Sequence, residues 1–242
     1  MSNVYIGISN VYYLVNKQDH TLITSPGGSG SLYYCSGEET KSCAEQTGVG
    51  YYFVDQKTVY SCSITNGSLK CIKESIPDSR NACNADNIGK LFMKSGDITP
   101  SLCLNYVGGT ASVVELNGNT KGNYLVYKNA KPTENIFGIS GSNEKYAIVS
   151  IEDKIVNLNS TYTNSLKYVY VDATKNRVME KGDKDFPKSD GSTSEPDESK
   201  IMELLCNNGG ICKDSTTEQT FSSFTGFTGP GKYIITLHSL NN

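Results

Sequence analysis

Two cysteines placed symmetrically about an Asn-Gly pair are the feature that most limits how this chain can fold. Residues 62–71 read CSITNGSLKC. Asn66 and Gly67 favour the two-residue type I′ loop of a β-hairpin, and that loop places Cys62 directly opposite Cys71. Counting outward from the loop puts both cysteines on a non-hydrogen-bonded rung, where the Cα atoms come within reach of a disulfide. The segment therefore predicts a disulfide-bridged hairpin, formed in an oxidising compartment.

The eight cysteines of this 242-residue chain suit disulfides better than zinc. Six of them lie between positions 35 and 103, and none of these forms a CxxC pair, the spacing of many zinc sites. Joining each cysteine to its neighbour in sequence predicts four bridges, although spacing leaves other pairings open outside the hairpin. The predicted pairs are Cys35–Cys43, Cys62–Cys71, Cys83–Cys103 and Cys206–Cys212.

Other features of the sequence agree with a secreted or cell-surface protein. Asn66 and Asn159 each begin an N-glycosylation sequon. No apolar run is long enough to span a bilayer, so membrane insertion is not expected. The start, MSNVYIGISN, lacks the basic and apolar regions of a signal peptide, which predicts an expressed fragment of a longer secreted protein. A net charge of −3 without a basic run argues against a nucleic acid partner.

Short apolar runs, each beginning with aromatic or β-branched residues, recur along the chain. They read VYYLVNKQDHTLI at 11–23, GYYFVDQKTVYSC at 50–62, GNYLVYKNAKPTENIF at 122–137 and KYVYVDATKNRVM at 167–179. Each is typical of a strand, a polar turn and a second strand. Repeated units too small to bury their own face stack on one another. We therefore predict a mainly β protein whose disulfide-bridged hairpins stack into an elongated or solenoid-like domain over residues 1–180, with the clearest repeats at 11–105.

The C-terminal part of the sequence is different in character. Residues 181–195 are polar and without apolar periodicity, which predicts an exposed loop or linker. Ser194, Glu195 and Pro196 followed by DESKIMELL predict one short helix near 196–206, because a cap and a first-turn proline precede acidic and then apolar residues. A disulfide-pinned loop over 206–231 and a closing strand at 232–240 complete a segment, 196–242, that we expect to pack on the same domain.

No motif in the chain indicates catalysis, a metal or a cofactor. GFTGPGK has the spacing of a phosphate-binding loop, but Tyr233 stands where Ser or Thr is needed and a strand-like run follows. His20 and His238 are the two histidines, and neither lies in a nucleophile motif. The acidic segment 183–190 lacks the ligand spacing of a calcium loop. We therefore expect no enzyme activity, no bound metal and no cofactor.

Tyrosine is the residue that suggests a binding role. The chain has sixteen tyrosines and no tryptophan. Tyrosine suits strands, because its ring packs on a pleated surface while its hydroxyl stays in water. On a rigid platform, Tyr, Asn and Ser also make adaptable contacts at low entropic cost, which favours a non-catalytic binding module. The candidate contact residues, taken from the Tyr-Tyr pairs, are Tyr12, Tyr13, Tyr33, Tyr34, Tyr51 and Tyr52.

The runs YYLVNKQDHTLI, LYYCSGEETKSC, GYYFVDQKTVYSC and GSLKC resemble the Gly-Tyr-Tyr and cysteine repeats of the very large scaffoldins of anaerobic gut fungi. This resemblance covers mainly residues 11–105. It implies a secreted or cell-surface cellulosome scaffold whose repeats act as cohesins. Such repeats bind the small, disulfide-rich dockerins of plant-cell-wall-degrading enzymes. The resemblance assigns no dockerin-contacting residue.

Two alternative functions stay open at this stage. A carbohydrate-binding or adhesive cell-wall module would stack sugar rings on planar arrays of exposed tyrosines, although the absence of tryptophan counts against it. A polysaccharide-degrading enzyme on a β scaffold would need two or more carboxylates that converge in a groove. The acidic candidates are Glu38, Glu39, Asp55, Glu115, Glu152 and Asp153.

Overall fold

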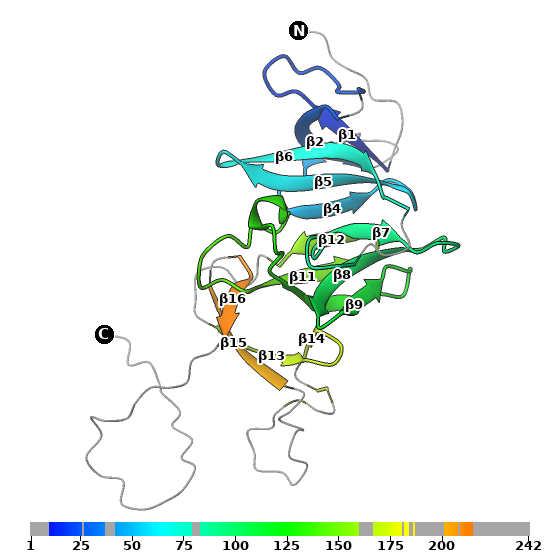
Figure 1. The fold of residues 1–242 in the computed structure, drawn as a ribbon. Coiled ribbons are helices and arrows are strands. Elements are labelled where there is room, and N and C mark those ends of the chain that lie inside the picture. Colours follow the sequence, from blue (N-terminus) through cyan, green and yellow to red (C-terminus); the bar gives the residue numbers. More distant parts are fainter. Residues whose placement is uncertain are drawn as a thin grey trace, which may run out of the picture.

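The part of the chain that the structure describes is mainly antiparallel β-structure (Figure 1). The computed structural model describes residues 10–25, 27–36, 42–78, 83–159, 167–180, 182–183, 186, 201–207 and 209–214. Within these residues there is no α-helix, and one short 3-10 turn lies at Pro132–Glu134. The strands are β1 Val11–Val15, β2 Ser29–Ser36, β3 Ser42–Glu45, β4 Gly50–Phe53, β5 Thr58–Thr65, β6 Ser68–Ser75, β7 Leu91–Met93, β8 Pro100–Val107, β9 Thr110–Glu115, β10 Gly122–Tyr127, β11 Tyr146–Glu152, β12 Ile155–Leu158, β13 Lys167–Asp172, β14 Arg177–Val178, β15 Ile201–Asn207 and β16 Ile211–Asp214.

One long sheet contains most of these strands, in the order β1-β2-β6-β5-β4-β12-β11-β10-β14-β13-β15-β16, with β3 attached to β2. Strand β11 is a branch point in this sheet. Its first residues pair with β16, while its last four pair with β12. Because β16 returns to β11, strands β10, β11, β16, β15, β13 and β14 close into a six-stranded barrel. In Figure 1 this barrel lies at one end of the molecule, and β1, β2 and β6 lie at the other.

Three cores hold the fold together, and strand alternation assigns residues to them. The main core lies between the long sheet and the separate sheet β7-β8-β9. The barrel core fills the closed barrel, and Tyr146 and Ile148 of β11 face it while Ala147 and Val149 face the main core. A third cluster lies beneath β1 and β2. We call it the tyrosine core, and its members are Leu14, Leu32, Tyr52, Tyr60, Cys62 and Cys71, with Tyr12, Ile23, Leu69 and Ile155 packed against them.

All four disulfide pairs predicted from local connectivity are present. Cys62 and Cys71 are direct cross-strand partners with a Cα–Cα distance of 4.0 Å. The turn between them has positive φ at both central residues, 52° at Asn66 and 74° at Gly67, as a type I′ turn requires. The hairpin predicted from CSITNGSLKC is therefore confirmed in turn type, register and crosslink.

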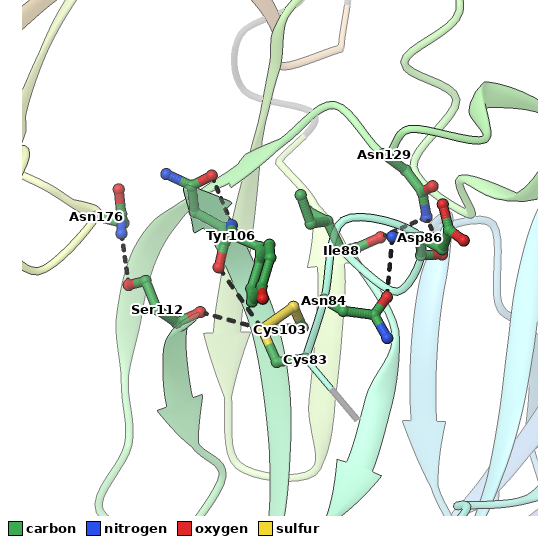
Figure 2. Close-up of a disulfide and its surroundings, with 10 residues drawn as sticks. Cys83, Asn84, Asp86, Ile88, Cys103, Tyr106, Ser112, Asn129 and Asn176 are labelled. Atoms are coloured by element: carbon green, nitrogen blue, oxygen red, sulfur yellow. Dashed lines mark hydrogen bonds between the residues drawn. A yellow bond between two sulfur atoms is a disulfide. The ribbon is translucent and has the colours of Figure 1, made fainter. Parts of the chain in front are cut away.

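The Cys83–Cys103 bridge anchors a segment without strand structure to β8 (Figure 2). The side-chain amide of the buried Asn129 holds the same segment from the other side. It donates to the carbonyl oxygen of Asp86 at 2.8 Å and to that of Ile88 at 3.0 Å. Crosslink and amide together fix this irregular stretch over the main core.

Reduction under native conditions is expected to open Cys35–Cys43 first. Cys43 is exposed, whereas Cys62 and Cys71 are each 0% exposed. Thiol–disulfide exchange requires access of the attacking thiolate to a sulfur, so buried bridges react only when the fold opens. Brief treatment with low dithiothreitol, trapping with N-ethylmaleimide and peptide mapping should detect labelled Cys35 and Cys43 before any other pair. Labelling of Cys62 or Cys71 at the same rate would contradict this order.

Two predictions about the fold are wrong. The short helix expected near 196–206 is strand β15 over its described part, because residues 201–206 pair along their whole length with β13. Leu204 and Cys206 face the barrel core while Glu203 is exposed, which is the alternation of a strand. The solenoid-like stack is also incorrect, since the sheet forks at β11 and closes into a barrel.

Several segments named above lie outside the described residues. These are residues 196–200 of the expected helix, most of the linker 181–195, and all of 215–242, including the closing strand. The Cys206–Cys212 bridge lies within the hairpin of β15 and β16, whose strands pair with β13 and β11. The part of 196–242 that the structure describes is thus continuous with the long sheet.

Candidate functional site

Tyr51 and Tyr52, two of the predicted contact residues, are structural residues in this fold. They are 4% and 1% exposed and, as neighbours in β4, face opposite sides of the sheet. Tyr51 packs its ring edge-on against Phe137, and its hydroxyl donates to the carbonyl oxygen of Gly89 at 3.0 Å. Burial raises the pKa of both hydroxyls. Neither ring is accessible to a partner, which corrects the sequence-based assignment of these two residues.

Tyr12 and Tyr34 face inward and form an aromatic cluster over the tyrosine core. The ring of Tyr12 lies 4.9 Å from that of Tyr34, 5.7 Å from Tyr52 and 6.2 Å from Tyr60, measured between centroids. Burial, together with Tyr34 and Tyr52 nearby, raises the pKa of Tyr12 to about 12. The cluster holds β1 and β2 onto the sheet beneath them.

Tyr13 and Tyr33 face the opposite way from Tyr12 and Tyr34. They are direct cross-strand partners of β1 and β2, so their half-buried rings stand side by side on one face. Glu45 of β3 lies opposite Tyr33 and forms an ion pair with Lys17 at 2.7 Å. We call this surface the outer tyrosine face, defined by Tyr13, Tyr33, Val11, Val15, Glu45 and Lys17.

A pocket of about 800 Å³ opens at one end of the main core. Phe53, Ile151 and Val156 contribute to its apolar lining. Asp55 and Asp153, two of the acidic candidates, lie at this pocket on separate turns. Asp55 accepts a hydrogen bond from its own turn at 2.7 Å, and Asp153 lies 3.7 Å from the ammonium of Lys121. Both carboxylates thus have structural partners in their own loops or on the neighbouring loop.

The remaining acidic candidates do not join this pocket. Glu152 lies at a different groove, and Glu115 is exposed at the end of β9. Glu38 and Glu39 lie outside the described residues. The structure therefore places two of the six candidate catalytic carboxylates, Asp55 and Asp153, at one pocket.

A second groove, of about 790 Å³, is lined mainly by polar side chains, and of its amides the sequence analysis named only Asn159, as a glycosylation sequon. We call it the amide groove. Its lining residues are Glu45, Gln46, Thr47, Gly48, Tyr52, Lys121, Gly122, Asn123, Ser150, Ile151, Glu152, Asn157, Leu158 and Asn159. Asn123, Ser150 and Asn157 come from three different strands, so only the sheet register reveals that they are neighbours.

The two glycosylation sequons differ in accessibility. Asn66 is exposed at the tip of the β5–β6 hairpin. Asn159 is 9% exposed, and its side-chain nitrogen, the atom that would carry a glycan, donates to Oδ1 of Asn123 at 2.8 Å. The folded chain therefore offers Asn66 for modification and holds the Asn159 amide in a hydrogen bond.

The described part of the chain contains no cluster of three or more His, Cys, Asp or Glu side chains that could hold a metal ion. Nor do the described residues include a helix long and apolar enough to cross a membrane. Comparison of the chain with protein families, with curated proteins and with solved structures finds no match.

Proposed function

We propose that this chain is a non-catalytic protein-binding module that uses the outer tyrosine face as its contact surface. The observation that carries the proposal is the Tyr13–Tyr33 pair, two adjacent, half-buried rings on one face of β1 and β2. Tyrosine is enriched at protein interfaces because it combines a large apolar ring with a hydroxyl that remains hydrated. Two such rings together supply the anchor that a small partner needs.

The support beneath this face suits a preformed interface. The Cys35–Cys43 bridge joins β2 to β3, and the opposite face of β1 and β2 is packed on the tyrosine core. The rings are therefore presented without rearrangement of the backbone. A preformed surface loses less entropy on binding than a mobile one, which favours affinity.

The partner we propose is a dockerin, the small disulfide-rich domain carried by plant-cell-wall-degrading enzymes. This choice rests on the resemblance of residues 11–105 to fungal scaffoldin repeats, a span that includes the whole outer tyrosine face. Four disulfides are consistent with an extracellular scaffold of this kind.

Calorimetric titration of the oxidised chain with a recombinant fungal dockerin tests the proposal. Saturable binding is expected, and Tyr13→Ser and Tyr33→Ser are each expected to weaken it by about 30-fold, the effect of a 2 kcal/mol hot spot. Val107→Ser is the matched control. This side chain is apolar and 65% exposed at the end of β8, outside the outer tyrosine face, and its removal should leave the affinity unchanged.

Absence of dockerin binding, or equal affinity in the tyrosine variants and wild type, would overturn the proposed surface. Hydrolysis of a plant-cell-wall polysaccharide by the purified chain would contradict its non-catalytic character. Far-UV circular dichroism of each variant shows whether the sheet is intact, so that a loss of binding can be separated from a loss of fold.

A further inference from the structure

The floor of the amide groove is a row of three polar side chains on neighbouring strands. Asn123 of β10 lies directly opposite Ser150 of β11, and Ser150 lies directly opposite Asn157 of β12. Direct cross-strand partners place their Cβ atoms about 5 Å apart on the same face of a sheet. Such a spacing brings several hydrogen-bonding groups within reach of one small ligand.

The row crosses the sheet between two apolar clusters on the same face. Leu125 and Ile148, two positions from Asn123 and Ser150 on β10 and β11, belong to the barrel core. Ile155, two positions before Asn157, packs against the tyrosine core. The polar row thus interrupts an otherwise apolar face, and packing within the fold does not require polar residues there.

Hydrogen bonds within the groove fix its amides. Oδ1 of Asn123 accepts from the Ser150 hydroxyl at 2.7 Å and from the Asn159 amide at 2.8 Å. The amide nitrogen of Asn157 donates to the Tyr52 hydroxyl oxygen at 3.1 Å. Side chains already held in this way lose little conformational entropy when a ligand arrives.

Two glycines let Asn157 lie close against the backbone. A Cβ at Gly48 would stand 2.6 Å from the Asn157 side-chain nitrogen, and one at Gly50 would stand 2.8 Å from its side-chain oxygen. Any larger residue would displace the amide from the floor of the groove. The backbone is therefore shaped around this side chain.

Hydrogen-bonding capacity remains unused in the groove. Within the described residues, the side-chain nitrogen of Asn123 makes no hydrogen bond, while its oxygen makes two. Oδ1 of Asn157 is buried and also lacks a partner. Asn123 and Asn157 lie on either side of β11, about 10 Å apart at the usual spacing of strands. Buried polar groups normally have partners, so the orphaned acceptor at one end of the row and the unused donor at the other indicate a ligand with more than one hydrogen-bonding group.

We propose that the amide groove binds a neutral saccharide. A saccharide carries several hydroxyls, each able to donate and to accept, which matches an amide donor at one end of the row and an amide acceptor at the other. The floor itself carries no charge, and the charged lining residues are of both signs: Glu45, paired with Lys17 at 2.7 Å, Lys121, paired with Asp153 at 3.7 Å, and Glu152. A groove of mixed charge does not select for an anion or a cation. The groove volume of about 790 Å³ also lies within the range of small-ligand sites.

This site differs from the tyrosine platform expected of a carbohydrate-binding module. The Tyr52 ring is 1% exposed and presents its hydroxyl to the groove, so no stacking contribution is available from it. Recognition then rests on hydrogen bonds that compete with water, and the affinity should be in the millimolar range.

Heteronuclear NMR titration of the oxidised, ¹⁵N-labelled chain tests the proposal at this affinity. The probes are cellohexaose, xylohexaose and mannohexaose, each added to about 10 mM, ten times the Kd of a millimolar ligand. At least one should shift the side-chain amide signals of Asn123 and Asn157. Asn157→Ala should weaken that binding about fivefold, the loss of one hydrogen bond. This variant leaves the Tyr52 hydroxyl its bond to the Gly48 carbonyl at 3.1 Å, so it should fold.

Asn119→Ala is the matched control. Asn119 is exposed between β9 and β10, its side chain makes no hydrogen bond in the described structure, and its loss should not change the affinity. Asn123→Ala provides a second groove variant if Asn157→Ala proves unstable. No shift with any hexasaccharide, shifts confined to another surface, or unchanged affinity in the groove variants would overturn the proposal. The outer tyrosine face lies outside the groove lining except for Glu45, so this failure would leave the proposed protein-binding function in place.

Discussion

Gly50→Ala is expected to destabilise the chain by about 4 kcal/mol or more, a loss found only where a substitution forces a severe steric or backbone conflict. Gly50 has a φ of +144°, a conformation that residues with a Cβ rarely adopt. A Cβ there would lie 1.9 Å from the carbonyl oxygen of Val156. Backbone of the paired strand cannot yield without breaking the β4–β12 ladder, which consists of three residue pairs.

Gly96→Ala is the matched control for this prediction. Gly96 also has positive φ, at +89°, but nothing lies within 4 Å of the position its Cβ would take. Only the left-handed backbone cost of about 1 to 2 kcal/mol should remain. Urea unfolding of both variants, followed by far-UV circular dichroism, compares the two free energies. Equal losses would show that β4 and β12 separate easily, and that their pairing does not join the two ends of the long sheet.

Local rules account for the part of this fold that the sequence predicts well. The Asn-Gly turn determines its own hairpin, because turn type and register depend on residues within ten positions of one another. The same is true of the short-range bridges Cys35–Cys43 and Cys206–Cys212, whose partners face each other across adjacent strands.

Non-local pairing accounts for what the sequence does not reveal. The barrel closes because β16 pairs with Tyr146 and Ala147 of β11, far away in the chain. The apolar run of β11 is typical of any buried strand. It does not indicate that alternate residues pack in two different cores. Likewise, IMELLC from position 201 satisfies both helical and alternating spacing, and pairing with β13 decides between them.

The candidate sites, too, could be predicted from the sequence only in part. A strand sends neighbouring side chains to opposite faces, so one tyrosine of each Tyr-Tyr pair must point inward. Tyr12 and Tyr13 follow this rule, and the rule was available from the sequence. The amide groove could not be predicted from the sequence, because Asn123, Ser150 and Asn157 are neighbours only through the order and register of three strands.

Removing the hairpin bridge, which is buried at both cysteines, is expected to cost more stability than removing a bridge of nearly the same loop length that is buried at one cysteine. The separations are 9 residues for Cys62–Cys71 and 8 for Cys35–Cys43. Loop-closure entropy therefore predicts nearly the same loss for each, about 2.5 to 3 kcal/mol. Cys62 and Cys71 are both 0% exposed in the tyrosine core, whereas in the other bridge Cys35 is 4% exposed and Cys43 is exposed. Truncating two buried sulfurs adds a cavity cost of about 1 to 2 kcal/mol.

The double variant Cys62→Ala/Cys71→Ala should thus lose about 4 to 5 kcal/mol, against about 3 to 3.5 kcal/mol for Cys35→Ala/Cys43→Ala, where one buried sulfur is lost. Guanidinium unfolding of the two variants and the oxidised wild type measures both losses, with the midpoint and slope reported separately. Equal losses would mean that the crosslinks act only on the unfolded chain and that the tyrosine core closes over the missing sulfurs. A larger loss for the Cys35–Cys43 pair would mean that β3 contributes to the fold beyond its attachment to β2. The outer tyrosine face would then be supported mainly by that bridge and not by the core beneath it.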